Sequence, residues 1–207
     1  EHLDAAIGRV LEALKTTGLE RNTLDAFTAD NGGSLPHAQN NDPFRDGKTS
    51  HYDGGLRVPF MVRFPGLVSP GSKSDYAGLN FDLFPTLLEL ANIERSTELD
   101  AVSLLPVLKG GTIDQPRDLY FVRREGGPAY GGKSYEALIR GPWKLMQNSP
   151  YGPLELYDLK NDPQEKTDLA AKNKKLVNEL GTALRAHIQR GGATPWHLQP
   201  PPARGEG

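Results

Sequence analysis

The hydrophobic positions near the start of the chain recur with a helical period. Between residues 3 and 14 they fall at i, i+3, i+4 and i+7, which predicts an amphipathic helix with one apolar face: Leu3, Ala6, Ile7, Val10, Leu11 and Leu14. Gly18 is expected to end this helix, because glycine adopts the left-handed backbone of a helix terminus without strain. Residues 23–29 then predict a strand, followed directly by the turn sequence Asp30-Asn31-Gly32-Gly33.

A long polar segment separates this strand from the next one. Residues 34–55 show no apolar periodicity, and a loop of this length inside a compact domain is usually functional or disordered. Residues 58–64 predict a buried strand, and Asp82 is expected to cap a helix with Pro85 in its first turn. Helices that alternate with strands predict an α/β fold, in which ligands bind at the carboxyl ends of the strands.

The pattern changes near residue 95. Short apolar runs separated by turns predict a small antiparallel sheet: residues 119–122, 137–140, 143–147 and 154–159. A final amphipathic helix is expected over about residues 172–189, ended by Gly191-Gly192. We therefore predict a large α/β part over residues 1–95, a small α+β part over residues 96–190 and a loose tail over residues 191–207.

Composition narrows the chemistry that the chain can perform. Lys and Arg number 24 against 26 Asp and Glu, so no basic face is indicated and nucleic acid is not an expected partner. The absence of cysteine excludes disulfides, thiolate metal ligands and a cysteine nucleophile within this chain. No run approaches the roughly 20 apolar residues of a membrane helix, and no signal peptide is visible in this chain.

Several sequence blocks, in this order and spacing, resemble the sulfatase family of the alkaline-phosphatase-like superfamily. They are T-L-D-A-F-T-A-D-N-G-G at residues 23–33, P-F-R-D-G-K-T-S-H-Y-D-G-G-L-R-V-P-F at 43–60, D-L-F-P-T-L-L-E-L-A at 82–91, V-S-L-L-P-V-L-K-G at 102–110, G-P-W-K-L at 141–145 and E-L-Y-D-L-K-N-D-P-Q-E at 155–165. The resemblance covers about residues 1–185. It implies the carboxy-terminal part of an alkaline-phosphatase-like doubly wound sheet, plus a small α+β subdomain with an antiparallel sheet and a carboxy-terminal helix.

The resemblance also implies site residues. Asp30 and Asn31 match the family's pair of ligands to a divalent cation, usually calcium, and their oxygen atoms suit that ion. Lys48 matches the lysine that contacts the sulfate group. Taken alone, Asp30-Asn31-Gly32 would indicate an ordinary turn and Lys48 a solvated surface lysine. The surrounding blocks are what favour the functional interpretation.

Two histidines and two acidic residues complete the set of candidates. His37 and His51 lie nearest the motifs, and histidine can donate a proton near neutral pH, so both are candidates for contact with substrate. Asp53 stands where the family more often has Glu, at a position interpreted as structural. Asp25 stands where the family usually has an apolar residue, and a carboxylate inside a buried strand is costly unless it is paired.

The activity implied is hydrolysis of a sulfate ester, for example on a sulfated sugar, by a formylglycine nucleophile made from Cys or Ser in a C/S-x-P-x-R motif. This chain lacks that motif, since Ser34-Leu35-Pro36-His37 has no Arg, and it lacks the family's first acidic metal pair. We therefore expect both upstream of Glu1, in a missing amino-terminal half of the same enzyme, and no activity from this chain alone. Family resemblance implies a periplasmic or secreted enzyme acting on a sulfated small molecule or sulfated glycan.

Two other interpretations stay open at this point. A phosphoester hydrolase of the same superfamily would prefer a pair of transition metals with several histidine ligands, and this chain shows no such cluster. The other alternative is a non-catalytic truncated module that acts only in binding or assembly.

Overall fold

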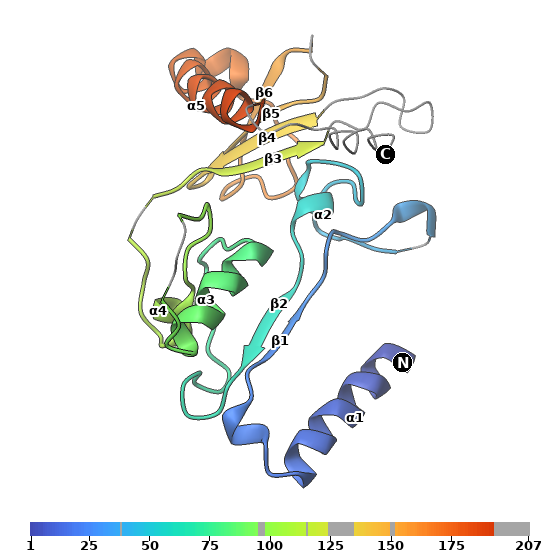
Figure 1. Cartoon of the computed structure of the whole chain (residues 1–207). Coiled ribbons are helices and arrows are strands. Elements are labelled where there is room, and N and C mark those ends of the chain that lie inside the picture. Colours follow the sequence, from blue (N-terminus) through green and yellow to red (C-terminus); the bar gives the residue numbers. More distant parts are fainter. Residues whose placement is uncertain (38, 95–97, 115, 124–134, 150–151, 193–207) are drawn as a thin grey trace, which may run out of the picture. The chain divides into compact units, whose positions relative to one another are not determined.

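The computed structural model describes residues 1–37, 39–94, 98–114, 116–123, 135–149 and 152–192 (Figure 1). Contacts within the chain divide it into two units, the first made of residues 1–32 and 57–115 and the second of residues 33–56 and 116–207. This division differs from the expected stretches, because the long polar segment joins the second unit and residues 96–115 join the first. Most of the expected tail lies outside the described residues.

The first unit combines two short strands with five helical segments among its described residues. Its elements are α1 (His2–Thr16), η1 (Glu20–Asn22), β1 (Asp25–Thr28), β2 (Phe60–Arg63), η3 (Asn80–Asp82), α3 (Leu83–Leu90) and α4 (Leu105–Leu108). β1 and β2 are antiparallel, with Asp25 opposite Arg63 and Thr28 opposite Phe60. Gly18, at a φ of 72°, follows α1 as predicted.

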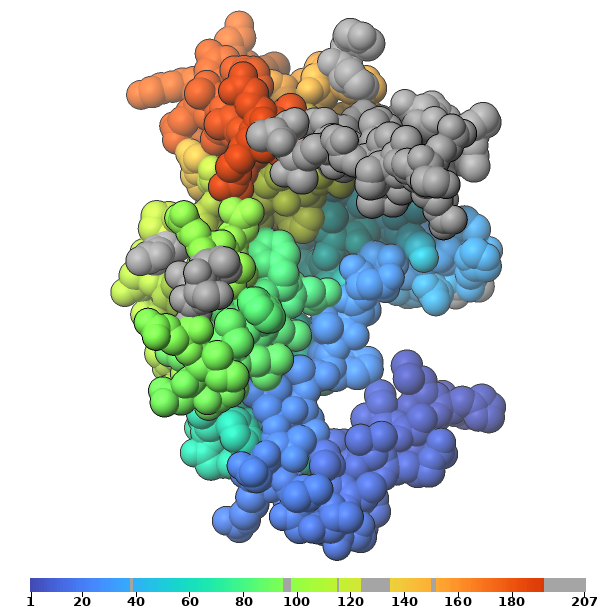
Figure 2. Space-filling view, viewed as in Figure 1, coloured from blue at the N-terminus to red at the C-terminus, as the bar shows by residue number. Residues whose placement is uncertain are grey.

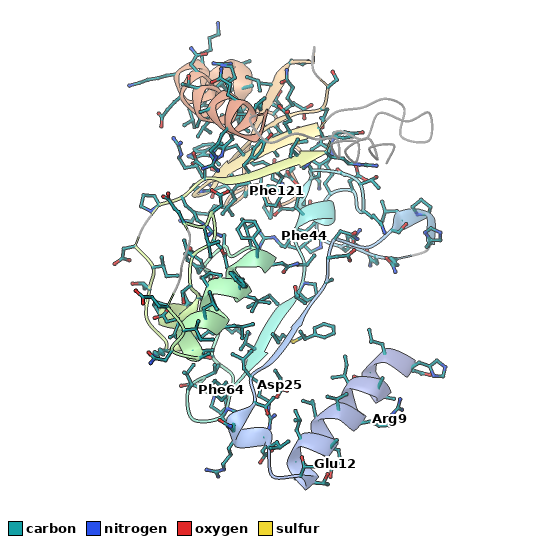
Figure 3. The ribbon with its side chains drawn as sticks, in the orientation of Figure 1. Arg9, Glu12, Asp25, Phe44, Phe64 and Phe121 are labelled. Atoms are coloured by element: carbon teal, nitrogen blue, oxygen red, sulfur yellow. The ribbon has the colours of Figure 1, made fainter. Side chains whose placement is uncertain are left out.

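Much of the apolar surface of the first unit is open. α1, the dark blue helix at the amino terminus (Figure 2), buries none of its residues, and Leu3, Val10 and Leu11 on it are exposed. Arg9 and Glu12 also lie on this helix (Figure 3). The expected burial of β2 is wrong for this chain, since Phe60 is 39% and Met61 58% exposed. The strand forms as its β-branched and aromatic residues predict, but its first two residues, which point to opposite faces, are both exposed.

Polar contacts hold the first unit together. The Asp25 carboxylate lies 2.8 Å from Arg63, which also reaches Glu20 at 3.0 Å, so the unusual acid of β1 is paired (Figure 3). Asp82 caps α3 as predicted, but its carboxylate binds outside the helix: it accepts bonds from the backbone nitrogens of Leu79 and Val102. This fully buried acid therefore links the start of α3 to the segment before α4.

The second unit is an antiparallel sheet covered on both faces. Its strands follow chain order: β3 (Leu119–Arg123), β4 (Tyr135–Arg140), β5 (Trp143–Gln147) and β6 (Leu154–Asp158). α5 (Lys174–Gly192) packs on one face, where the buried leucines of sheet and helix meet: Leu138, Leu145, Leu156, Leu180 and Leu184. This confirms the expected antiparallel sheet and carboxy-terminal helix. Helix α5 includes the two glycines that were expected to end it, and Gly192 is its last described residue.

The opposite face of this sheet receives the polar segment of residues 33–56. Ala137, Met146 and Tyr157 form a second buried cluster there with Tyr52, which comes from that segment. Among its described residues the segment contains only η2 (Leu35–His37) and α2 (Asp53–Leu56), and these residues are otherwise irregular as expected. Further along the chain, η5 (Ala170–Lys172) precedes α5. No helix within the described ranges is long and apolar enough to cross a membrane.

Candidate functional site

The predicted cation ligands lie in the first unit, just after β1. Asp30 is exposed and Asn31 is half-buried. The turn is held from beside it by Asn80, whose amide nitrogen donates to Ala29 O at 2.8 Å and whose oxygen accepts from the Thr28 hydroxyl at 2.9 Å. The amide nitrogen of Asn31 donates to Gly32 O at 2.8 Å, which leaves its amide oxygen as the atom suited to a cation.

These two residues fit calcium in chemistry but not in number. They offer a carboxylate and an amide oxygen, the donor types that calcium prefers, whereas the ion takes six to eight oxygen ligands. Among the described residues, no group of three or more His, Asp or Glu could hold a metal ion. Asp30 and Asn31 alone are therefore too few ligands for calcium, and their role as its ligands stays a prediction.

Lys48, the predicted sulfate ligand, lies in the second unit on a tightly bonded loop. Its backbone nitrogen donates to Gly33 O at 2.9 Å. Asn41 holds the same loop from within: its side-chain oxygen accepts from Gly33 N at 2.7 Å, and its nitrogen donates to Gly33 O and Asp46 O. The Lys48 side chain itself is exposed. The loop thus fixes the backbone of Lys48 and leaves its ammonium open to an anion.

The backbone on both sides of Lys48 is strained. Asp46 has a φ of 63° and Thr49 a φ of 83°, a region that β-branched residues rarely adopt. The carbonyl of Thr49 accepts a bond from Arg123 Nη1 at 2.6 Å. Such strain persists only where surrounding contacts impose it, and it is concentrated at functional sites.

Two glycines allow this loop to close on itself. A Cβ on Gly54 would lie well inside contact distance of the carbonyl oxygens of Arg45 and Asp46. A Cβ on Gly55 would meet the carbonyl oxygens of Gly47 and Ser50 in the same way. Because these obstacles are backbone atoms, they cannot move aside without opening the loop. The Gly-Gly pair of the motif is therefore a packing requirement.

The two candidate histidines lie in different environments. His37 is exposed, with its Nδ1 2.8 Å from the Ser34 hydroxyl. His51 is 4% exposed, its ring lies 5.7 Å from that of Tyr135, and its Nδ1 finds no hydrogen-bond partner among the described residues. Burial, reinforced by Lys144 and Arg123, lowers the pKa of His51 to about 4. At neutral pH this imidazole is uncharged, which makes it a poor proton donor.

A buried charge cluster behind the loop was not anticipated from the sequence. Lys144 on β5 is fully buried, and its ammonium lies 2.5 Å from Asp53 Oδ1 and 2.8 Å from Glu165 Oε1. It also donates to His51 O at 3.1 Å. Burial raises the pKa of Glu165. One signal was available: Lys144 lies on the same face of β5 as Met146, so a strand with both faces covered must bury it.

A second polar cluster holds Tyr52, which lies four residues after Lys48 in the same loop. The Glu155 carboxylate accepts from the Tyr157 hydroxyl at 2.6 Å and from the Tyr52 hydroxyl at 3.0 Å. The Arg45 guanidinium lies 3.8 Å from the centre of the Tyr52 ring. Burial, followed by Glu155, raises the pKa of Tyr157. Both phenols therefore stay neutral and act as hydrogen-bond donors that orient the carboxylate.

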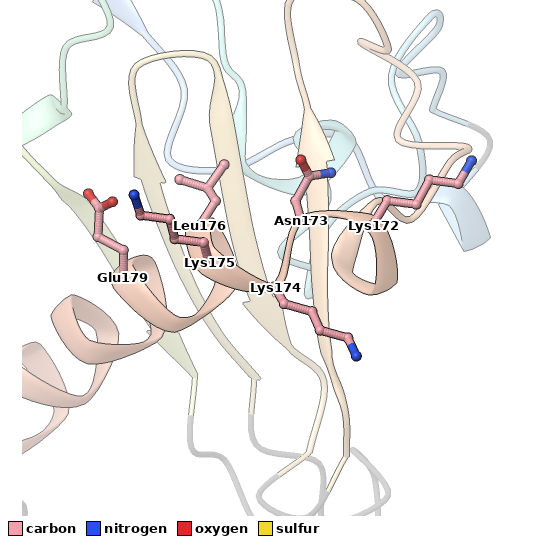
Figure 4. Close-up of a pocket in the computed structure, with 6 residues that line it drawn as sticks. All are labelled: Lys172, Asn173, Lys174, Lys175, Leu176 and Glu179. Atoms are coloured by element: carbon pink, nitrogen blue, oxygen red, sulfur yellow. The ribbon is translucent and has the colours of Figure 1, made fainter.

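Two shallow recesses lie on the surface of the second unit. One lies at the start of α5 and is lined by Lys172, Asn173, Lys174, Lys175, Leu176 and Glu179 (Figure 4). The other is lined by Pro43, Arg45, Gln164, Glu165 and Lys166. Lys48 and His51 are not among the described residues that line either recess. Within this unit the predicted sulfate ligand Lys48 is exposed.

Comparison with known proteins identifies one family. The family model described as Sulfatase matches residues 1–93. Steryl-sulfatase of Mus musculus is 30% identical, over 97% of this chain and 38% of that protein. The chain thus spans about two fifths of the length of this relative.

Solved structures agree with the sequence comparison. A structure of Ps i-CgsB in complex with k-i-k-neocarrahexaose matches with a TM-score of 0.76 and 31% identity, over 90% of this chain and 40% of that one. A structure of BT4656 in complex with its substrate D-glucosamine-2-N,6-O-disulfate matches with a TM-score of 0.73 and 26% identity, over 90% of this chain and 38% of that one. These neighbours confirm the expected fold class.

The structural neighbours include a protein that is named as a phosphonate ester hydrolase and not as a sulfatase. Phosphonate monoester hydrolase SpPMH of Silicibacter pomeroyi matches with a TM-score of 0.71 and 26% identity, over 90% of this chain and 38% of that one. The fold of this region is therefore shared by proteins named for sulfate esters and for phosphonate esters.

Proposed function

Because this chain belongs to the sulfatase family and corresponds to a carboxy-terminal region of it, we propose that it supplies part of a site for sulfate ester hydrolysis. The observation that carries the proposal is the Lys48 loop, in which the matching lysine is exposed on a strained and heavily bonded backbone. An ammonium in that position would attract the sulfate oxygens. Asp30 and Asn31 would provide two oxygen ligands to calcium, which supplies charge stabilisation when bound.

We further propose that the nucleophile comes from a part of the enzyme outside this chain, which contains no cysteine and no matching serine motif. The open apolar surface of the first unit supports this. Leu3, Val10, Phe60 and Met61 are all more than a third exposed. An amino-terminal part of the same enzyme, of the kind that the longer relatives contain, would cover them. Without that part we expect this chain to be inactive.

For the substrate we propose a sulfated sugar or a sulfated small molecule, processed in the periplasm or outside the cell. The support is the substrate bound in the structure of BT4656, D-glucosamine-2-N,6-O-disulfate, and the name of steryl-sulfatase. Of the two histidines, His37 is better placed for substrate contact because it is exposed, whereas His51 is buried. A phosphonate or phosphate ester is a second candidate substrate, on the strength of the Silicibacter pomeroyi neighbour.

The test uses the full-length gene product that carries this chain, assayed with an aryl sulfate, a sulfated monosaccharide and an aryl phosphonate. We expect turnover of the sulfate esters, and a loss of about 100-fold or more in kcat/KM for Lys48→Ala. Lys73→Ala, at an exposed position of the first unit, is the control and should leave activity unchanged. Higher turnover of the phosphonate would favour the second candidate, and no turnover of any ester would favour a non-catalytic module.

Calcium binding offers a test that does not depend on activity. Two oxygen ligands from Asp30 and Asn31 leave at least four to be found, so we expect this chain alone to bind calcium weakly or not at all in calorimetry. Sub-micromolar binding that is lost in Asp30→Ala would mean that the chain holds more ligands than the two assigned. In the full-length protein, the same substitution should weaken calcium binding.

A further inference from the structure

The loop that carries Lys48 is anchored to the sheet of the second unit at one buried point. Lys144 is fully buried on β5 and donates to His51 O at 3.1 Å and to Asp53 Oδ1 at 2.5 Å. Both acceptors belong to the loop, three and five residues after Lys48. One ammonium therefore holds the carboxyl-terminal side of the loop against the sheet.

Glu165 extends this anchor to the amino-terminal side of the loop. Its Oε1 accepts from Lys144 at 2.8 Å and its Oε2 from Asp53 N at 2.6 Å. Its backbone oxygen accepts from Arg45 Nη1 at 2.7 Å. The cluster therefore contacts the loop both before and after Lys48. Glu165 itself has a φ of 52°, so the anchor also carries local backbone strain.

Burying these charges costs desolvation free energy, which indicates that the cluster does more than stabilise the fold. A buried lysine with two carboxylates must lose its hydration, and apolar residues of similar volume often stabilise a core as well or better. Met146 and Tyr157, which share this face of the sheet with Lys144, are both buried, so an apolar residue here would also have apolar neighbours. An ammonium differs from an apolar side chain because its hydrogen bonds are directional, so it fixes the positions of its two acceptors in the loop.

We propose that Lys144 is a positioning residue: through Asp53, Glu165 and the His51 carbonyl it holds the strained loop in the one conformation that presents Lys48 to the sulfate group. This inference rests on the proposed function of Lys48. Because residues 45–55 pack closely on their own backbone at Gly54 and Gly55, fixing Asp53 and the His51 carbonyl also fixes the backbone of Lys48. Thr49 O is held separately by Arg123, and the Tyr52 hydroxyl by Glu155, so the loop is also attached to the sheet at points other than Lys144.

A double-mutant cycle in the full-length gene product tests this role. Lys144→Met should lower kcat/KM for an aryl sulfate by about 100-fold, since small misplacements of a binding group cost that much. In a Lys48→Ala background it should lower kcat/KM by no more than about threefold, because the group that it positions is already absent. The inhibition constant of inorganic sulfate should rise in parallel in the first case only. Lys160→Met, at an exposed turn, is the matched control.

Asp53→Asn covers the case in which Lys144→Met does not fold, because it keeps the side-chain size and one oxygen acceptor. It should show the same dependence on Lys48, with a smaller loss. A loss of equal size in both backgrounds would overturn the proposal, since Lys144 would then act on the fold as a whole. Unchanged kcat/KM in a folded Lys144 variant would also overturn it. If Lys48→Ala alone has no effect, the proposed function of Lys48 fails first, and the inference fails with it.

Discussion

The buried imidazole of His51 should make the second unit sensitive to mild acid. Its pKa is lowered from an ordinary value of 6.5 to about 4, so the unfolded chain binds a proton between these values that the folded chain excludes. The stability that this group contributes is therefore complete above pH 6.5 and is lost as the pH falls toward 4. Between pH 7 and pH 4.5 the expected loss in free energy of unfolding is about 2 kcal/mol.

Other titratable groups also change the free energy of unfolding with pH, so the contribution of His51 has to be measured separately. Lys144 on β5 and Arg123 on β3 both disfavour the imidazolium, while the raised pKa of Glu165 acts in the opposite direction, since protonation of that acid is favoured by folding. The pKa of Asp118, lowered chiefly by its bonds to Arg140, matters only below its ordinary value of 3.8. Comparing the chain with a His51→Gln variant at each pH isolates the histidine.

The assay is urea unfolding followed by the fluorescence of Trp143, which lies on β5. Trp196 would be replaced by Phe in every sample so that only one tryptophan reports. The chain should lose about 2 kcal/mol more than His51→Gln between pH 7 and pH 4.5, whereas the exposed His37→Gln should behave like the parent. Equal losses with and without His51, or an imidazole pKa of 6.5 or above by NMR titration, would refute the reasoning.

Three further predictions concern stability, each measured by thermal or urea unfolding. Gly54→Ala should disrupt the second unit, whereas Gly8→Ala in α1, where a Cβ meets nothing, should be neutral or stabilise by up to about 1 kcal/mol; an undisturbed Gly54→Ala would contradict the packing argument. Leu180→Ala should cost about 2–5 kcal/mol, and Val10→Ala, at 60% exposure, less than about 0.5 kcal/mol. Asp25→Ala should cost at most about 1 kcal/mol, because its ion pair is partly exposed; a larger cost would mean that the pair is structural.

The sequence alone determined the features that depend on near neighbours in the chain. Hydrophobic periodicity located α1, α3 and α5 and the four strands of the second unit. The residues on one face recur every second position in a strand and every third or fourth position in a helix. Gly18 and Asp82 marked helix ends for the same local reason. Motifs in order and spacing identified Asp30, Asn31 and Lys48 as candidates, although their roles stay predictions.

Only the tertiary structure decided which distant groups meet. Lys144 lies 91 residues from Asp53 and 21 from Glu165, and nothing in the sequence near any of them records that a buried ammonium would join them. The same contacts assign residues 33–56 to the second unit, against the expectation from chain order. Alternation along a strand can predict that Lys144 is buried, but the partners that make this burial tolerable come from separate segments. Their pairing is set by packing across the sheet, which is a property of the folded chain.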